Sequence, residues 1–92
     1  MNKEFCIRFK NSVKNLEKKY NIKLNSICPF DSEEKTVAII GKQHTLAELF
    51  LECKNFIEDN NPELCYVQTI SNFHIDDSPF EMIYIFRING RI

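Results

Sequence analysis

The chain has few residues that break regular structure. Its 92 residues include two glycines, three prolines, two histidines and no tryptophan. Glycine-rich loops are what bring several backbone N–H groups to a bound phosphate, so this scarcity argues against a nucleotide-binding site. It instead predicts long helices and strands joined by short connections.

Long apolar segments are also missing. No run is long enough to cross a bilayer, and the N-terminal stretch MNKEFCIRFK carries charges where a secretion signal is continuously apolar. We therefore expect a cytoplasmic protein without membrane contact. Hydrophobic residues make up 43% of the chain and charged residues 27%, which is close to ordinary globular usage. This length predicts a single domain over residues 1–92.

The four cysteines form no Cys-x-x-Cys pair. Each lies among apolar neighbours, which is typical of cysteines that act as small buried hydrophobic residues. With no secretion signal there is no support for a disulfide framework, and we expect reduced, buried thiols at Cys6, Cys28, Cys53 and Cys65. A zinc site would require ligands from separate elements to converge, so no metal or other cofactor is expected.

Residues 3–20 have the periodicity of an amphipathic helix. Apolar side chains recur every three or four residues and predict one buried stripe: Phe5, Phe9, Val13, Leu16 and Tyr20. The opposite side carries a lysine ridge at i, i+4 and i+8: Lys10, Lys14 and Lys18. Residues 1–23 hold seven basic and two acidic side chains, whereas the rest of the chain is acidic. A ridge of this kind can track phosphates, but without arginine or interleaved aromatic rings the binding would be weak and nonspecific.

A second helix is predicted for residues 45–60. Thr45 and Glu48 have the spacing of a capping box, which predicts a start at Thr45, and Asn-Asn-Pro closes the segment. Before it, Gly41 is a lone glycine, and Lys42 is followed by Gln43 where a phosphate loop has Ser or Thr, so we expect a capped connection there. Ala47 and Leu51 lie away from the apolar stripe of this helix and offer a contact for a partner.

Four strands are predicted around these helices, at residues 23–28, 36–40, 65–75 and 81–88. The second and third flank a helix and could run parallel through a crossover. In the third strand, alternation predicts a buried face made of Cys65, Val67, Phe73 and Ile75. The order αββαββ predicts an α+β domain with a four-stranded, largely antiparallel sheet and two helices packed on one face.

The last predicted strand, EMIYIFRI, is apolar on both faces. If Tyr84 and Phe86 point toward the helices, Ile83 and Ile85 lie on the face that the helices leave bare. Exposed apolar strands favour aggregation, so we expect this face to be covered. A second copy is the simplest cover, which predicts a homodimer with Ile83 or Ile85 at or near its interface.

Catalytic patterns are absent from the sequence. No paired-carboxylate, Gly-x-Ser-x-Gly or His-Glu-x-x-His arrangement occurs. His74 and Asp76 share a strand face at i, i+2, which could orient an imidazole or supply two metal ligands, but two ligands do not make a site. A small enzyme or metal protein therefore ranks third among the functional classes.

These patterns favour a small binding module that acts by occupying a macromolecular partner, most simply a protein. The predicted contacts are Ala47, Leu51, Ile83 and Ile85, with Asp76 and Asp77 among acidic turn residues that suit a basic surface. A nucleic-acid-associated regulator that uses the lysine ridge is the alternative. The short domain, rich in Asn, Lys and Ile, is typical of inhibitors that phages and other mobile elements direct against host defence systems, anti-CRISPR proteins included. This is an analogy of protein type, with no motif behind it.

Overall fold

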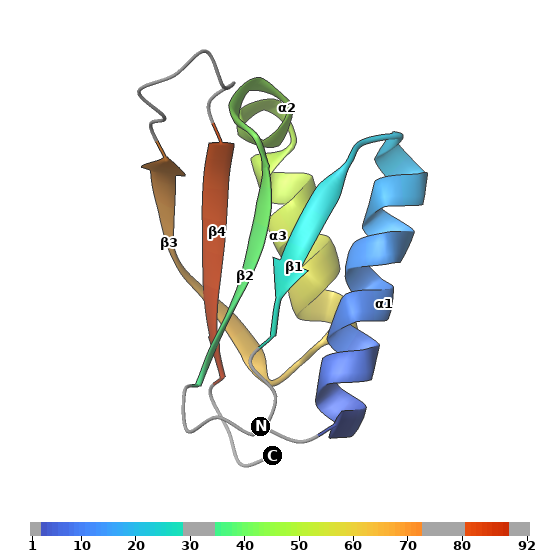
Figure 1. The fold of residues 1–92 in the computed structure, drawn as a ribbon. Helices are drawn as coiled ribbons and strands as arrows, with labels where there is room; N and C mark the ends of the chain where they lie inside the picture. Colours follow the sequence, from blue (N-terminus) through green and yellow to red (C-terminus); the bar gives the residue numbers. More distant parts are fainter. Residues whose placement is uncertain (1–2, 29–34, 73–80, 89–92) are drawn as a thin grey trace.

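A four-stranded sheet and its helices make up the computed structural model, which describes residues 3–28, 35–72 and 81–88. The elements are α1 (Lys3–Tyr20), β1 (Leu24–Ile27), β2 (Thr36–Lys42), α2 (Gln43–Glu48), α3 (Phe50–Asn60), β3 (Leu64–Asn72) and β4 (Glu81–Ile88). The strand order is β1-β2-β4-β3, and every neighbouring pair is antiparallel (Figure 1). The predicted α+β class is confirmed, and α1 has the predicted bounds.

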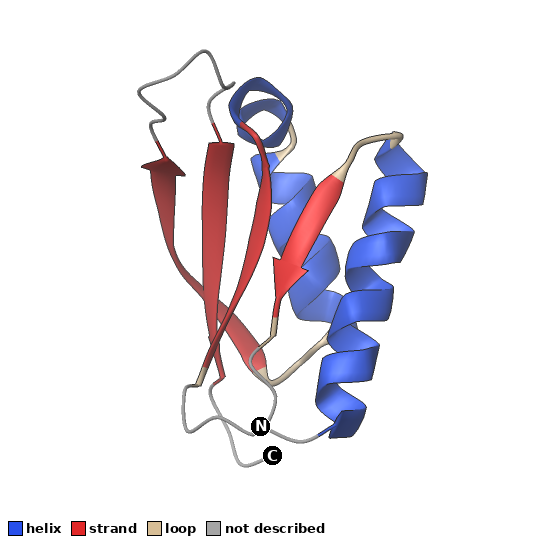
Figure 2. Ribbon diagram, in the orientation of Figure 1, coloured by secondary structure: helices blue, strands red, loops and turns tan. Residues whose placement is uncertain are grey.

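The core lies between one face of the sheet and the helices (Figure 2). The predicted stripe of α1 is buried at Phe5, Phe9, Val13 and Leu16, and Tyr20 packs at its margin. The sheet contributes alternate residues of its two central strands, because side chains two apart share a face. These are Val37 and Ile39 of β2 and Tyr84, Phe86 and Ile88 of β4.

The connection from β2 to β3 passes over β4, which lies between these two strands in the sheet. Both strands run antiparallel to β4, so they run parallel to each other, as the sequence allowed, but β4 separates them and they share no ladder. As a result β4, the most apolar strand, is central, and β1 and β3 form the two edges.

The predicted single helix over residues 45–60 is wrong in two respects. β2 continues to Lys42 and α2 begins directly at Gln43, two residues before the predicted start. The helix is also interrupted at Leu49, whose ψ of 19° departs from helical geometry, and α3 begins at Phe50. The Tyr84 hydroxyl donates a hydrogen bond to the Leu46 carbonyl, so a side chain from β4 anchors α2 next to this break. Thr45 is the third residue of α2 and does not precede the helix, so it cannot be its N-cap, and the predicted capping box is wrong.

The lone glycine beside α2 serves packing. A Cβ atom at Gly41 would lie 2.7 Å from Cδ2 of Leu24 and 2.9 Å from Cδ1 of Leu46. Gly41 is buried within β2 and its φ is negative, so the position needs a small residue and no special backbone conformation. A close approach of β1 and α2 therefore explains this glycine.

The predicted buried face of the third strand is wrong at the two positions that the structure describes. A bulge between Tyr66 and Gln68 shifts the register, and Cys65 and Val67 are exposed. Leu64 is buried in their place and Tyr66 packs against the core. The predicted positions Phe73 and Ile75 lie outside the described residues.

Candidate functional site

The face of the sheet opposite the helices carries an apolar surface. Alternation along β4 directs Ile83 and Ile85 away from the core side chains Tyr84 and Phe86. The strand register extends this surface across all four strands, because residues directly opposite each other share a face. We call the resulting set the outer apolar face: Ile27, Ala38, Ile40, Ile70, Ile83 and Ile85.

The outer apolar face is organised in two rows. In one row Ile40, Ile83 and Ile70 are consecutive register partners on β2, β4 and β3. In the other, Ile27, Ala38 and Ile85 follow one another on β1, β2 and β4. At the edges, Ile27 is 51% exposed and Ile70 is 42% exposed, whereas the central members are half-buried by their neighbours. The described helices lie on the opposite face and leave these rows uncovered (Figure 2).

Polar side chains frame the two rows. Lys42 and Glu81 are register partners at one end of the sheet, and Thr36 and Arg87 are partners at the other. On the flanks, Asn25 follows Ile40 on β1 and Gln68 follows Ile85 on β3. An apolar centre with a polar rim is the usual anatomy of a protein–protein interface.

Two of the predicted contact residues belong to this face and two do not. Ile83 and Ile85 lie on it as predicted. Ala47 is exposed on α2 and Leu51 is 63% exposed on α3, so both are accessible, but they belong to the helical layer. Asp76, Asp77 and His74 lie outside the described residues.

The contributions of β1, β2 and β3 to the outer apolar face were not predicted from the sequence. Alternation along the sequence places Ala38 and Ile40 on one face of β2 and separates Ile27 from its neighbours on β1. It does not show which strands lie next to β4. The position of Ile70 could not be predicted from alternation, because the bulge shifts the register of β3 and pairs Ile70 with Ile83.

The lysine ridge is exposed along α1. Lys10, Lys14 and Lys18 all face solvent, as the helical periodicity predicted. The nearby Arg8 is not part of it, because its guanidinium forms an ion pair with Glu63. Near the end of the helix, the Lys19 Nζ lies 5.4 Å from the centre of the Phe56 ring, so this lysine is drawn toward α3.

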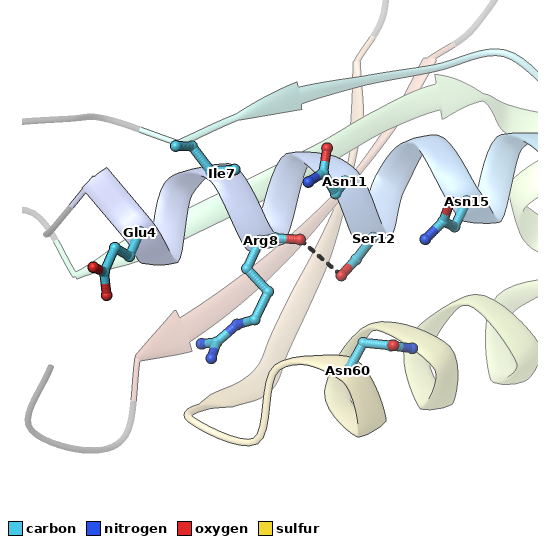
Figure 3. Close-up of a pocket in the computed structure, with 7 residues that line it drawn as sticks. All are labelled: Glu4, Ile7, Arg8, Asn11, Ser12, Asn15 and Asn60. Carbon is cyan, nitrogen blue, oxygen red and sulfur yellow. Dashed lines mark hydrogen bonds between the residues drawn. The ribbon is translucent and has the colours of Figure 1, made fainter.

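A hollow lies between α1 and the end of α3 (Figure 3), lined by Glu4, Ile7, Arg8, Asn11, Ser12, Asn15 and Asn60. Beside it, Asn61 is completely buried: its amide donates to Ser12 Oγ at 3.2 Å and accepts from Arg8 Nε at 3.3 Å. Ser12 Oγ in turn donates to the Arg8 carbonyl at 2.9 Å. Because these groups satisfy one another, we interpret the network as a structural link between the two helices.

The cysteines differ from one another in burial. Cys6 and Cys53 are buried as predicted, but Cys28 is only half-buried and Cys65 is exposed on β3. The prediction of four buried thiols is therefore met in part at Cys28 and is wrong at Cys65. Burial, with a smaller contribution from Glu52, raises the pKa of the Cys53 thiol to about 11, which makes it a poor nucleophile at neutral pH. Within the described ranges, no group of three or more His, Cys, Asp or Glu residues could hold a metal ion.

None of the helices in the described part of the chain has the length and apolarity needed to span a membrane. Comparisons with protein-family models, curated proteins and solved structures found no match to this chain.

Proposed function

We propose that the protein is a binding module that occupies a protein partner through its outer apolar face. The observation behind this proposal is the two rows of apolar side chains, in register across four strands and framed by charge. Contiguous apolar patches with polar rims mark sites of protein association. An apolar sheet face left in water would favour aggregation, so we expect a partner to cover it.

The size of the face limits the strength of binding. Four strands about 4.8 Å apart and the seven residues of β2, at about 3.4 Å each, give a face of roughly 19 Å by 24 Å, or ~460 Å². A standard interface buries about 800 Å² on each partner. The rows alone would therefore support only weak binding, and a tight complex would have to engage the charged rim as well.

A second copy of the chain is one occupant that fits the rim. A twofold axis parallel to the strands, between β2 and β4, would place Ile40 over Ile83 of the second copy. The same operation would place Lys42 opposite the second copy's Glu81 at the end of the sheet, so that unlike charges meet. We propose a weak homodimer on this basis, with Ile83 and Ile85 at its centre.

Light scattering over a wide concentration range tests the homodimer. The informative variant is Ile70→Lys, because an edge residue that is 42% exposed can direct a lysine into solvent without unfolding the domain. The matched control is Leu51→Lys, on α3 and away from the sheet. We expect the mass of the wild type and of Leu51→Lys to rise toward two chains, and Ile70→Lys to stay at one. A wild-type mass of one chain at every concentration would reject the homodimer.

The same variants test the binding module itself. The wild type, Leu51→Lys and Ile70→Lys are immobilised separately, and lysate of the native host is passed over each. A protein retained by the wild type and by Leu51→Lys but lost from Ile70→Lys supports the outer apolar face. Equal retention by all three would reject that face, and loss only from Leu51→Lys would move the contact to the helical layer. Thermal unfolding of each variant verifies that it is folded.

The analogy with inhibitors from phages and mobile elements suggests one class of partner, a component of a host defence system. Phage plating on a host with an active CRISPR system provides the test. Wild-type protein, but not Ile70→Lys, is expected to restore plating if the protein is anti-CRISPR-like. Unchanged plating would reject this class while leaving the binding module to the lysate experiment.

The exposed lysine ridge supports a second candidate function, a nucleic-acid-associated regulator. Three lysines on one side of α1 are free to approach a phosphate backbone. The ridge and the outer apolar face lie on different layers, so separate variants can test the two functions.

A further inference from the structure

Two cysteines that are distant in sequence lie side by side in the fold. The Sγ atoms of Cys6 and Cys28 are 2.7 Å apart, although 22 positions separate the residues. Cys6 lies on the buried face of α1, and Cys28 immediately follows the end of β1. The thiol of Cys28 points directly at the sulfur of Cys6, so the side chains already face each other.

We propose that Cys6 and Cys28 form a reversible disulfide that fastens α1 to the end of β1. A disulfide bond is about 2.05 Å long, so the sulfurs have to approach by only roughly 0.7 Å. Small side-chain rotations cover this distance, and α1 and β1 are held together in either state through the shared apolar core of Phe5, Phe9 and Leu24.

Glutathione disulfide is a suitable oxidant. The thiolate of Cys28, the more accessible of the two, attacks one glutathione sulfur, and one glutathione leaves as its thiolate. The thiolate of Cys6 then attacks Sγ of Cys28 in the mixed disulfide and expels the second glutathione. Overall, two protein thiols lose two electrons and two protons, and one glutathione disulfide becomes two molecules of reduced glutathione.

The surroundings of the pair make this reaction slow at neutral pH. Burial, followed by the hydrogen bond with Cys6 and the charge that Cys6 carries when ionised, raises the pKa of Cys28 to about 12, and nearby Lys10 offsets only part of this. The thiolate is the attacking species, so at pH values below this pKa the rate of the reaction should increase about tenfold for each unit by which the pH is raised. The pair would therefore respond to sustained oxidation and not to brief exposure.

The experiment treats the full chain with glutathione disulfide at pH 9 and then maps disulfide-linked peptides by mass spectrometry. We expect one intramolecular bond between Cys6 and Cys28 and a rise in melting temperature of about 10 °C, which dithiothreitol reverses. The variant Cys28→Ala, at a half-buried position, should show neither change. The control Cys65→Ser, at an exposed cysteine on β3, should behave as the wild type.

Four free thiols after a day at pH 9 would overturn the proposal, as would a bond that involves Cys53 or Cys65 instead. A bond between Cys6 and Cys28 that leaves the melting temperature unchanged would also overturn it, because the link would then fasten nothing. None of these outcomes depends on the outer apolar face or on a partner.

Discussion

Replacing Tyr84 with phenylalanine should destabilise the domain through a single hydrogen bond. The hydroxyl of Tyr84 donates to the Leu46 carbonyl, and neither residue is exposed to solvent. Phenylalanine keeps the ring, which packs edge-on against Phe50 with centroids 5.4 Å apart. The substitution therefore removes one donor and leaves a buried carbonyl without it.

The expected cost is about 2 kcal/mol, since an unsatisfied buried acceptor costs about 1–3 kcal/mol. For a domain of this size that corresponds to a fall in melting temperature of about 8–16 °C. The matched control is Tyr66→Phe on the neighbouring strand. The Tyr66 hydroxyl bonds to the Thr69 hydroxyl, and because both residues are only half-buried, water can replace the lost partner. We expect the control to cost less than half as much.

The pH dependence provides a second readout. Burial, assisted by Cys53 and Tyr66, raises the pKa of Tyr84 well above its ordinary value of 10. A group with a raised folded-state pKa contributes stability that is complete below its unfolded pKa and is lost as the pH rises through its folded pKa. Wild-type stability should therefore fall from about pH 10 upward. Tyr84→Phe should show a shallower alkaline decline.

The assay is urea unfolding of the wild type and both variants at pH 7 and through the alkaline range. A free energy of unfolding for Tyr84→Phe within about 0.5 kcal/mol of the wild type would contradict the role of this hydrogen bond, as would a larger loss for Tyr66→Phe. An alkaline loss of stability in Tyr84→Phe that parallels that of the wild type would contradict the contribution of the Tyr84 hydroxyl.

Three further perturbations test other parts of the structure. Gly41→Ala should cost about 1–3 kcal/mol in urea unfolding, because its Cβ would lie 2.7 Å from a neighbouring methyl carbon, and a neutral result would show that the packing there is loose. Burial alone would raise the pKa of Glu58, but hydrogen bonds from Lys54 and from the backbone N–H of Tyr66, with the charge of Lys54, lower it overall. Wild-type stability should therefore decline as the pH falls from about 4.5, and Glu58→Gln should flatten this acid limb; a limb of unchanged slope would contradict the assignment. Reversing the charge of the lysine ridge (Lys10, Lys14 and Lys18 to Glu) should abolish any retention of DNA or RNA at low salt, and wild-type protein that retains neither would eliminate the nucleic-acid alternative.

The sequence predicted α1 and the fold class because their signals are local and repetitive. Phe5, Phe9, Val13 and Leu16 recur at a strict helical spacing that only a helix with one buried side explains. The core face of β4 could also be predicted, because alternation along the strand places Tyr84 and Phe86 on the same face.

The errors arose where a distant contact overrides a local pattern. The break at Leu49 adjoins a carbonyl bonded by Tyr84, 38 residues away from Leu46, and no local propensity encodes that partner. Likewise, Cys65 lies on the opposite face from the one predicted because β3 contains a bulge. A prediction that assumes strict alternation along the strand takes no account of such an extra residue. The outer apolar face was predicted only on β4, because its other members depend on strand order.

The central position of β4 also determines the sequence of events in folding. β4 follows the other three strands in the chain, yet it supplies the partner for both β2 and β3. During synthesis on the ribosome, only the β1–β2 hairpin can pair before β4 emerges, while β3 waits with an open edge. Formation of the sheet is therefore a late event that depends on contacts between distant segments, which slows folding and prolongs exposure of unpaired strands. A nascent chain stalled after β3 would be a substrate for chaperones, and release of β4 would complete two ladders at once.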